Sequence, residues 1–236
     1  MSTQPTNWDE LRKSVKKCQF DDCPRHKDKF KILFDREESS LSKIKFVVVS
    51  QEPGYSLKKR KKPFKNSEEV EEFLISECLK EKDNKATPIN RVKNIFRKDK
   101  FNPTTDEIYW THALKCIPKE SDKGIHKAWK NCASLNCVKH FINELKLIPS
   151  RKLIVIPMGN YALTLCRHIL EEDHPLSKVG GISKYIRTFN VEKIFPFEDK
   201  EILLFPFLHP SNRNRNLTDK IKSNEGKFSE KIRKFK

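Results

Sequence analysis

The chain has 236 residues, and its 49 Lys and Arg against 32 Asp and Glu give a formal net charge of +17. Residues 1–17 are polar and charged and no apolar run reaches the length of a membrane helix, so we expect neither a signal peptide nor a membrane span. We therefore expect a cytoplasmic protein with reduced cysteines. The positive surplus favours a polyanionic partner, most simply nucleic acid, although Lys can also serve solubility alone.

Hydrophobic periodicity predicts alternating strands and helices. Short runs of apolar, β-branched and aromatic residues predict buried strands at 45–50, 107–114, 152–159 and 201–209. Apolar residues at helical spacing, with Gly159 and Asn160 at the start of the fourth segment, predict helices at 7–17, 67–81, 126–147, 160–171 and 217–235. Near-continuous apolar strands are typical of a parallel sheet covered on both faces.

This alternation predicts an α/β fold, a three-layer α/β/α sandwich around a central, mainly parallel, four-stranded sheet. No stretch reads as a linker, so we expect one domain over residues 1–236 with a basic C-terminal helix or tail from about residue 217. In such sheets, ligands bind outside the carboxyl ends of the strands. Those ends carry Gln51 and Glu52, then His112, and finally His209, which predicts a site at one edge of the sheet.

The chain has seven cysteines, and four of them form two pairs that lie far apart in the sequence. Four residues separate the first pair and fifteen separate the second, and the pairs are Cys18 with Cys23 and Cys116 with Cys132. Four thiolates gathered from such pairs would hold zinc or an iron–sulfur cluster, whereas the alternative is that all seven are small core residues. Cys137 competes with Cys132 as a ligand, and Cys78 and Cys166 fall within helical patterns that favour the core.

Three sequence blocks occur in a fixed order. They are SQEPG at 50–54 with Phe64 ten residues after its glycine, THALKCIP at 111–118, and FLHPS at 207–211. In order and separation they resemble the uracil-DNA glycosylase superfamily, most closely its iron–sulfur branch, called family 4, over roughly residues 15–215. That branch has motifs similar to GEAPG, TN-x-x-KC-x-P and a strand ending in HP and a small residue.

The resemblance implies a [4Fe–4S] cluster held by Cys18, Cys23, Cys116 and Cys132, with zinc as the alternative. In these relatives the cluster is structural and ties the N-terminus to the loop after the second strand. The first pair departs from the C-x₂-C spacing of most relatives, which makes Cys18 the least secure ligand.

The resemblance also implies a catalytic pair. In the best-known branch the turn reads GQDPY and its Asp activates water, and Glu52 takes that position here. His209 would stabilise the departing base. The base pocket would hold Gln51, Gly54, Phe64 and His112, with Phe64 stacking on the flipped base. The alternatives are that Glu52 is a solvated turn residue, His209 caps a loop and Phe64 is a core aromatic.

Basic and hydroxyl side chains beside these motifs are expected to contact DNA phosphates. They are Lys58, Lys59, Arg60, Lys61 and Lys62 in the loop before Phe64, and Ser211, Arg213 and Arg215 after the last strand. Relatives have acidic residues in that loop. The basic run also fits a nuclear-targeting patch or a solvated surface.

His112 stands where the family has the Asn that reads uracil, and its ring presents donors and acceptors in a different geometry. We therefore expect a monomeric DNA glycosylase for a modified pyrimidine, including hypermodified phage cytosine excised in antiviral defence. The alternatives are a uracil-DNA glycosylase of base-excision repair, an inactive DNA-binding relative, and an RNA-binding α/β module.

Overall fold

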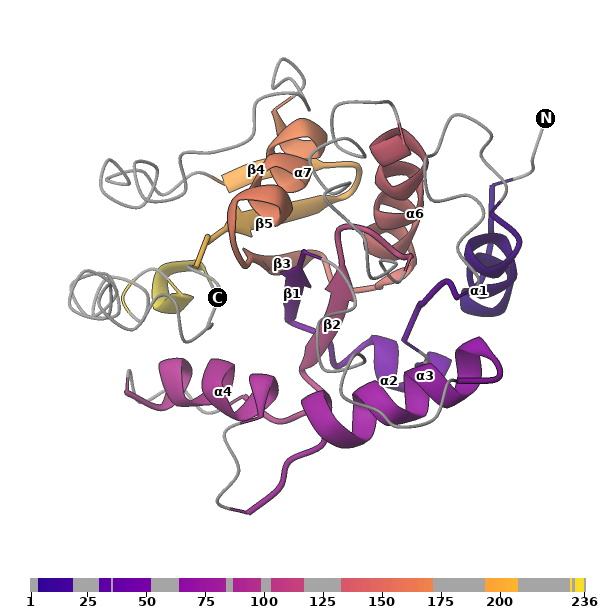
Figure 1. Ribbon diagram of the computed structural model, residues 1–236. Coiled ribbons are helices and arrows are strands. Elements are labelled where there is room, and N and C mark those ends of the chain that lie inside the picture. The colour runs from indigo at the N-terminus through magenta and orange to yellow at the C-terminus, as the bar shows by residue number, and fades with distance from the viewer. Residues whose placement is uncertain are drawn as a thin grey trace.

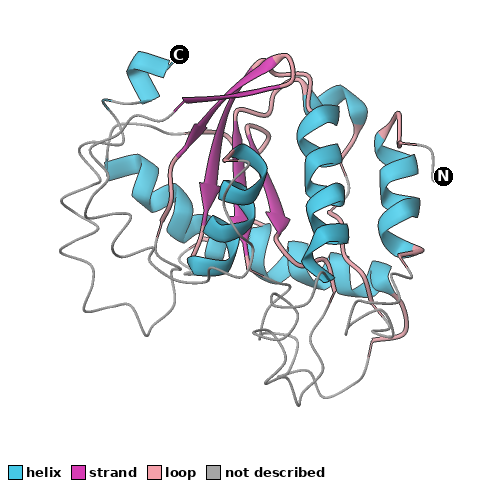
Figure 2. Ribbon diagram, turned by 90° about the horizontal axis from the view of Figure 1, so that it is seen from above, coloured by secondary structure: helices cyan, strands magenta, loops and turns pink. Residues whose placement is uncertain are grey.

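The computed structural model places a mixed five-stranded sheet at the centre of the protein, flanked by helices (Figures 1 and 2). The structure describes residues 4–18, 30–34, 36–51, 64–83, 87–98, 103–116, 133–171, 194–207, 230 and 232–235. None of the helices in these ranges is long and apolar enough to cross a membrane.

The sheet has the strand order β2-β1-β3-β5-β4. Its strands are β1 (Phe46–Ser50), β2 (Ile108–His112), β3 (Lys152–Pro157), β4 (Ile194–Phe197) and β5 (Lys200–Leu204). The first three and β5 run parallel, and β4 is antiparallel to β5 at the outer edge. The predicted mainly parallel α/β/α architecture is confirmed.

The predicted count of four strands is wrong, because β4 adds a fifth. This strand has only four residues and contains Pro196, which lacks a backbone donor and is tolerated in a sheet mainly at an edge. A two-residue turn joins β4 to β5, and Glu198 in that turn has a φ of 53°, in the left-handed region. A short, proline-containing edge strand leaves little hydrophobic pattern to detect.

Helices cover both faces of the sheet. The larger helices are α1 (Trp8–Lys16), α3 (Ser67–Leu74), α4 (Pro88–Lys98), α6 (Ala133–Leu147) and α7 (Asn160–Leu170), and α2 (Glu38–Leu41) is a single turn. Figure 1 shows α1, α6 and α7 on one side of the sheet and α3 and α4 on the other. The side chains of β1 alternate accordingly, because Val47 and Val49 pack with the first set of helices and Phe46 and Val48 with the second.

Several helix boundaries differ from the predicted ones. The helix expected at 67–81 ends at Leu74 and continues as a π-helical turn, η2 (Ile75–Leu79). The N-cap of α7 is Gly159, with φ 93°, and no side chain caps this helix. α4 was not predicted, although Ile89, Val92 and Phe96 follow helical spacing. The predicted helix at 217–235 lies largely outside the described residues, of which Glu230 and 232–235 are helical.

Candidate functional site

Four residues stand at one level across the carboxyl ends of the parallel strands. Ser50 of β1 pairs in register with His112 of β2, and Val49 pairs with Pro157 one step before it. Met158, the next residue after β3, forms a parallel bridge with Phe207, which follows β5. The ends of β1, β2, β3 and β5 therefore converge at one edge of the sheet, as predicted. This edge is formed by Ser50, His112, Met158 and Phe207.

The two predicted catalytic residues, Glu52 and His209, lie outside the described residues. Glu52 follows Ser50 by two positions, and His209 follows Phe207 by two positions. The strands that lead to them, β1 and β5, are separated by β3 alone. With about 4.8 Å between neighbouring strands, the two chains leave this edge roughly 10 Å apart.

Two predicted pocket residues are described in addition to His112. Gln51 is half-buried, and its backbone carbonyl accepts a hydrogen bond of 3.0 Å from the amide of Leu114. Phe64 is also half-buried and packs edge-on against Phe73 of α3, with ring centroids 5.5 Å apart. Phe64 therefore contacts the core below α3. Stacking of Phe64 on a base stays a prediction.

The remaining predicted contacts lie outside the described residues. They are Gly54, Lys58, Lys59, Arg60, Lys61, Lys62, Ser211, Arg213 and Arg215.

His112 is buried and neutral at the end of β2. Only 5% of its surface is exposed, and burial, followed by the positive charge of Lys115, lowers its pKa from 6.5 to about 3. A neutral imidazole carries one N–H donor and one nitrogen acceptor, whereas an imidazolium carries two donors. At neutral pH, His112 therefore acts as a hydrogen-bonding group and not as a cation.

A segment that the motifs did not indicate packs against His112. Residues 30–34, here called the edge segment, run beside the end of β2, because Lys31 forms an antiparallel bridge with Cys116. The backbone amide of Ile32 also donates to the carbonyl of Lys115 at 2.7 Å. The Phe34 ring lies 5.3 Å from the His112 ring, tilted by 41°. The edge segment therefore fixes one side of the imidazole. Alternating apolar residues at 30, 32 and 34 were the available sequence signal.

A buried ion pair fastens the end of β2 to α6. Lys115 pairs with Glu144 of α6, and their side chains are 2% and 0% exposed. The Lys115 ammonium also donates to the Thr111 hydroxyl at 2.5 Å, and the Tyr109 hydroxyl donates to the second Glu144 oxygen at 3.1 Å. Burial and the Glu144 charge raise the pKa of Tyr109, so this phenol stays protonated and remains a donor. Glu144 and Tyr109 were missed by sequence reasoning.

The same lysine affects a second histidine. His140 lies one turn before Glu144 on α6, and burial, then Lys115, lowers its pKa from 6.5 to about 4. Its Nε2 atom is buried, and no hydrogen-bond partner for it occurs within the described ranges. Lys115 therefore disfavours protonation of both His112 and His140.

The described cysteines named here lie after β2, after α1 and in the core. Cys116 is buried at the end of β2, and Cys18 is half-buried just after α1. Cys23 and Cys132 lie outside the described residues, and no group of three potential metal ligands occurs among the residues that are described. Cys137 and Cys166 belong to the core between α6, α7 and the sheet.

The buried ion pair gives a stability prediction. Lys115→Met leaves the Glu144 carboxylate buried without its cation and should lower the free energy of unfolding by about 3 to 5 kcal/mol. Lys115→Met combined with Glu144→Leu should cost less than either single change, because no charge then remains buried. Chemical denaturation of the four proteins measures this coupling.

A matched control lies on the same helix. Lys146→Met removes the partly exposed partner of the exposed Glu198, whose carboxylate lies 2.8 Å from the Lys146 ammonium, and should cost no more than about 1 kcal/mol. Equal losses for Lys115→Met and Lys146→Met would contradict a stabilising role for the buried pair.

The lowered pKa of His112 gives a pH prediction. The unfolded chain protonates this histidine below about pH 6.5, whereas the folded protein protonates it only near pH 3. The unfolded state therefore binds more protons between these values, and stability falls as the pH falls through that window. Between pH 7 and pH 5, the free energy of unfolding should fall by about 2 kcal/mol less in His112→Asn than in the unaltered protein. Urea denaturation at both pH values tests it, and an unchanged pH dependence in the variant would contradict the buried neutral state.

Comparison with known proteins identifies the family. The sequence model of the uracil DNA glycosylase superfamily matches residues 38–235, which is most of the chain. No curated protein matches the chain. The matched range begins after Cys18 and Cys23, so it carries no information on the iron–sulfur branch. The chain belongs to the uracil-DNA glycosylase superfamily, whose members are DNA glycosylases.

Proposed function

We propose that the protein hydrolyses the N-glycosidic bond of a flipped, modified pyrimidine in DNA and leaves an abasic site. The observation that supports this most directly is the common level of Ser50, His112 and Phe207, because Glu52 and His209 each follow that level by two residues. β1 and β5, which precede these two residues in sequence, are separated by β3 alone and so lie roughly 10 Å apart, a separation that would accommodate a nucleotide.

The proposed reaction divides the chemistry between these two residues. Glu52 accepts a proton from water while the water oxygen bonds to the sugar C1′ carbon, and its charge stabilises the cationic sugar. The bond from C1′ to the base nitrogen breaks, and the electron pair leaves with the base. His209 donates a hydrogen bond to the base oxygen on which the negative charge develops.

His112 is the basis for proposing a modified base. The family Asn at this position reads uracil with an amide, whereas the ring of His112 is larger, neutral and held against Phe34. A site built for one hydrogen-bond pattern discriminates strongly against another. Together with the basic residues 58–62, where relatives are acidic, this favours a substituted pyrimidine such as a hydroxymethylated or glucosylated phage cytosine. Its excision would serve antiviral defence.

A base-release panel tests this function. Oligonucleotides carrying uracil, hypoxanthine, 5-hydroxymethylcytosine or its glucosylated form are incubated with the protein, and abasic sites are detected by alkaline cleavage. We expect release of a modified cytosine, and losses of about 10²- to 10⁴-fold in rate for Glu52→Gln and His209→Ala. Lys139→Ala, an exposed change on α6, is the control and should retain full activity.

The outcomes separate the alternatives. Release of uracil alone would assign the protein to uracil repair. No release from any oligonucleotide, with DNA binding retained, would favour an inactive DNA-binding relative. Tighter binding to RNA than to DNA of equal length would favour the RNA-binding module.

We also propose that Cys18, Cys23, Cys116 and Cys132 hold a [4Fe–4S] cluster, with zinc as the alternative. The placement of Cys116 supports this, because Cys116 is buried and forms a β-bridge with Lys31. In sequence, residues 19–29 connect Cys18 to the segment that contains Lys31. Cys23 lies within that interval, and Cys132 directly precedes α6. Such a cluster would be structural, and its cysteines would tie α1, the edge segment and α6 to the end of β2.

Metal analysis of purified variants tests the ligand set. The protein should contain about four iron atoms per chain, and Cys116→Ser should lose them. Cys166→Ala should retain the iron, because Cys166 is buried in the core and its burial raises the pKa of the thiol. Retention by Cys137→Ala would exclude Cys137 as a ligand. Zinc without iron in the purified protein would overturn the cluster.

A further inference from the structure

A hollow of about 450 Å³ lies beside β2, the strand at one edge of the sheet. Its walls come from η2, from β2 and from the chain just before α2. The residues that matter for its chemistry are Phe34, Arg36, Ile75, Lys80, Glu81 and Trp110. This volume lies within the range of sites that bind small ligands.

One wall of the hollow is apolar and partly open to solvent. Trp110 and Phe34 are buried and form a fixed base for it, whereas Ile75 is 38% exposed. Ile75 begins the π-helical turn η2, and such turns occur frequently at functional sites. Ile75 is one of two large apolar side chains that are exposed among the described residues. The hollow therefore presents an apolar surface to a ligand.

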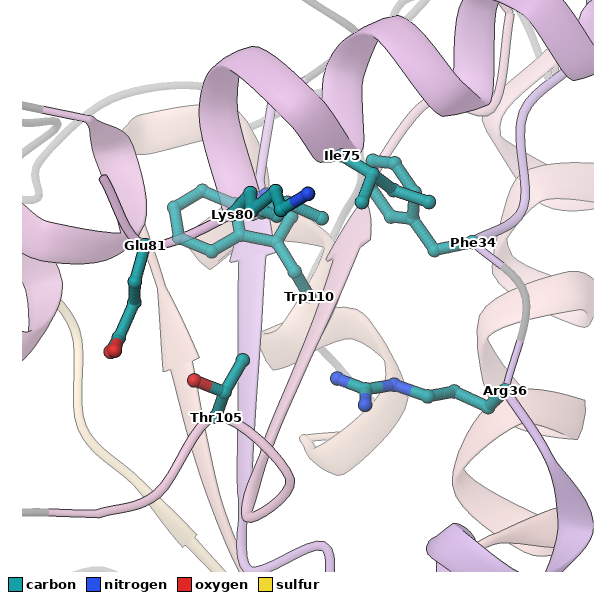
Figure 3. Close-up of a pocket in the computed structure, with 8 residues that line it drawn as sticks. Phe34, Arg36, Ile75, Lys80, Glu81, Thr105 and Trp110 are labelled. Carbon is teal, nitrogen blue, oxygen red and sulfur yellow. The ribbon is translucent and has the colours of Figure 1, made fainter.

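Two cationic side chains, Arg36 and Lys80, also line the hollow. Arg36 donates to the carbonyl of Ile108 at 2.5 Å, and burial lowers its pKa, although a guanidinium stays charged in proteins. Figure 3 shows its side chain extending into the space below the Trp110 ring. Lys80 is exposed at the rim, and Glu81 is already paired with Lys93. An anionic ligand group would therefore meet two cations and a carboxylate that is already neutralised.

The environment of Arg36 makes Lys80 the better probe of this charge. Arg36 also lines a separate polar hollow with Asp9, Glu37 and Glu38, and the Asp106 carboxylate attracts the same guanidinium. The hydrogen bond to the Ile108 carbonyl uses one of its five N–H donors. Substitution of Arg36 would disturb both hollows and the edge of β2, whereas substitution of the exposed Lys80 alters only the rim.

We propose that this hollow binds one nucleoside monophosphate unit, supplied by a DNA strand. The base would lie against Ile75 and Trp110, and the phosphate would contact Arg36 and Lys80. Aromatic and apolar surfaces beside basic side chains are the combination with which proteins hold single-stranded nucleic acid. The net charge of +17 favours a polyanion over a neutral or cationic ligand.

The hollow and the end of β2 share a wall. Phe34 lines the hollow, and its ring lies 5.3 Å from that of His112. Trp110 and His112 are two positions apart on β2, about 6.7 Å, and therefore face the same side of the sheet. A strand with one nucleotide at His112 would place a neighbouring nucleotide at the hollow. This placement rests on the proposed function, whereas nucleotide binding by the hollow does not.

Calorimetric titration tests the binding directly. The full chain is titrated with 2′-deoxynucleoside 5′-monophosphates, with the matching nucleosides, and with inorganic phosphate alone. We expect saturable binding of a monophosphate, and at least roughly tenfold weaker binding of the nucleoside and of phosphate, because each lacks one of the two contacts.

Two surface variants define the site. Ile75→Trp should fill the hollow and abolish binding. Lys80→Ala should weaken binding of the monophosphate by about tenfold and leave binding of the nucleoside unchanged. Both positions are exposed, so the fold should persist, which circular dichroism checks. Lys139→Ala, on the opposite face of the sheet, is the matched lysine control and should bind as the unaltered protein does.

A competition experiment identifies the source of the nucleotide. A short single-stranded oligonucleotide without a removable base should displace the monophosphate, and Ile75→Trp should weaken its binding. An oligonucleotide that binds without displacing the monophosphate would overturn the assignment to a DNA strand. Absence of monophosphate binding, or unchanged binding by Ile75→Trp, would overturn the site itself. None of these measurements needs base release, so a failure of the proposed glycosylase would be seen separately.

Discussion

The in-register pairing of parallel strands is the constraint on which the site depends. Parallel strands end at the same edge of a sheet, and here β1 and β2 end on the paired residues Ser50 and His112. A shift of one residue between these strands would move His112 to the other face of the sheet, because side chains alternate. The hydrogen bond of 3.2 Å from the Trp110 indole to the Ser50 hydroxyl exists only in the observed register. The core and the site thus require the same alignment.

The N-terminal part of the chain, which the superfamily model does not cover, is part of the same structure. Trp8 packs edge-on against Tyr109 of β2, at 5.3 Å between ring centroids. Arg12 of α1 pairs with the buried Glu71 of α3 at 2.7 Å, and Glu71 also accepts from the amide of Leu33. These contacts hold the edge segment against β2, where Phe34 meets His112. The environment of a family position is therefore set by residues outside the family match.

The sequence predicted those features whose signals are local. Continuous apolar runs located four strands, and their order along the chain indicated a parallel sheet with a site at the strand ends. The short strand β4 was not predicted, because a proline within four residues leaves no clear hydrophobic pattern. Contacts between segments distant in the sequence were not predicted either. Tyr109 and Glu144 are 35 residues apart, and nothing in either segment alone indicates that a helix carboxylate will meet a strand phenol and Lys115.

Burial of His112 also bears on how a base would be read. Cytosine presents an amino donor at the position where uracil and thymine present a carbonyl acceptor. An imidazolium would offer donors only and would favour the carbonyl. The neutral ring offers one donor and one acceptor, and its tautomer decides which of them faces the base. The positive charge of Lys115, itself held by Glu144, adds to the effect of burial in keeping the ring neutral. Burial, and then the positive charge of Lys115, thus leaves the ring an acceptor nitrogen, which the proposed recognition of a modified cytosine amino group would need.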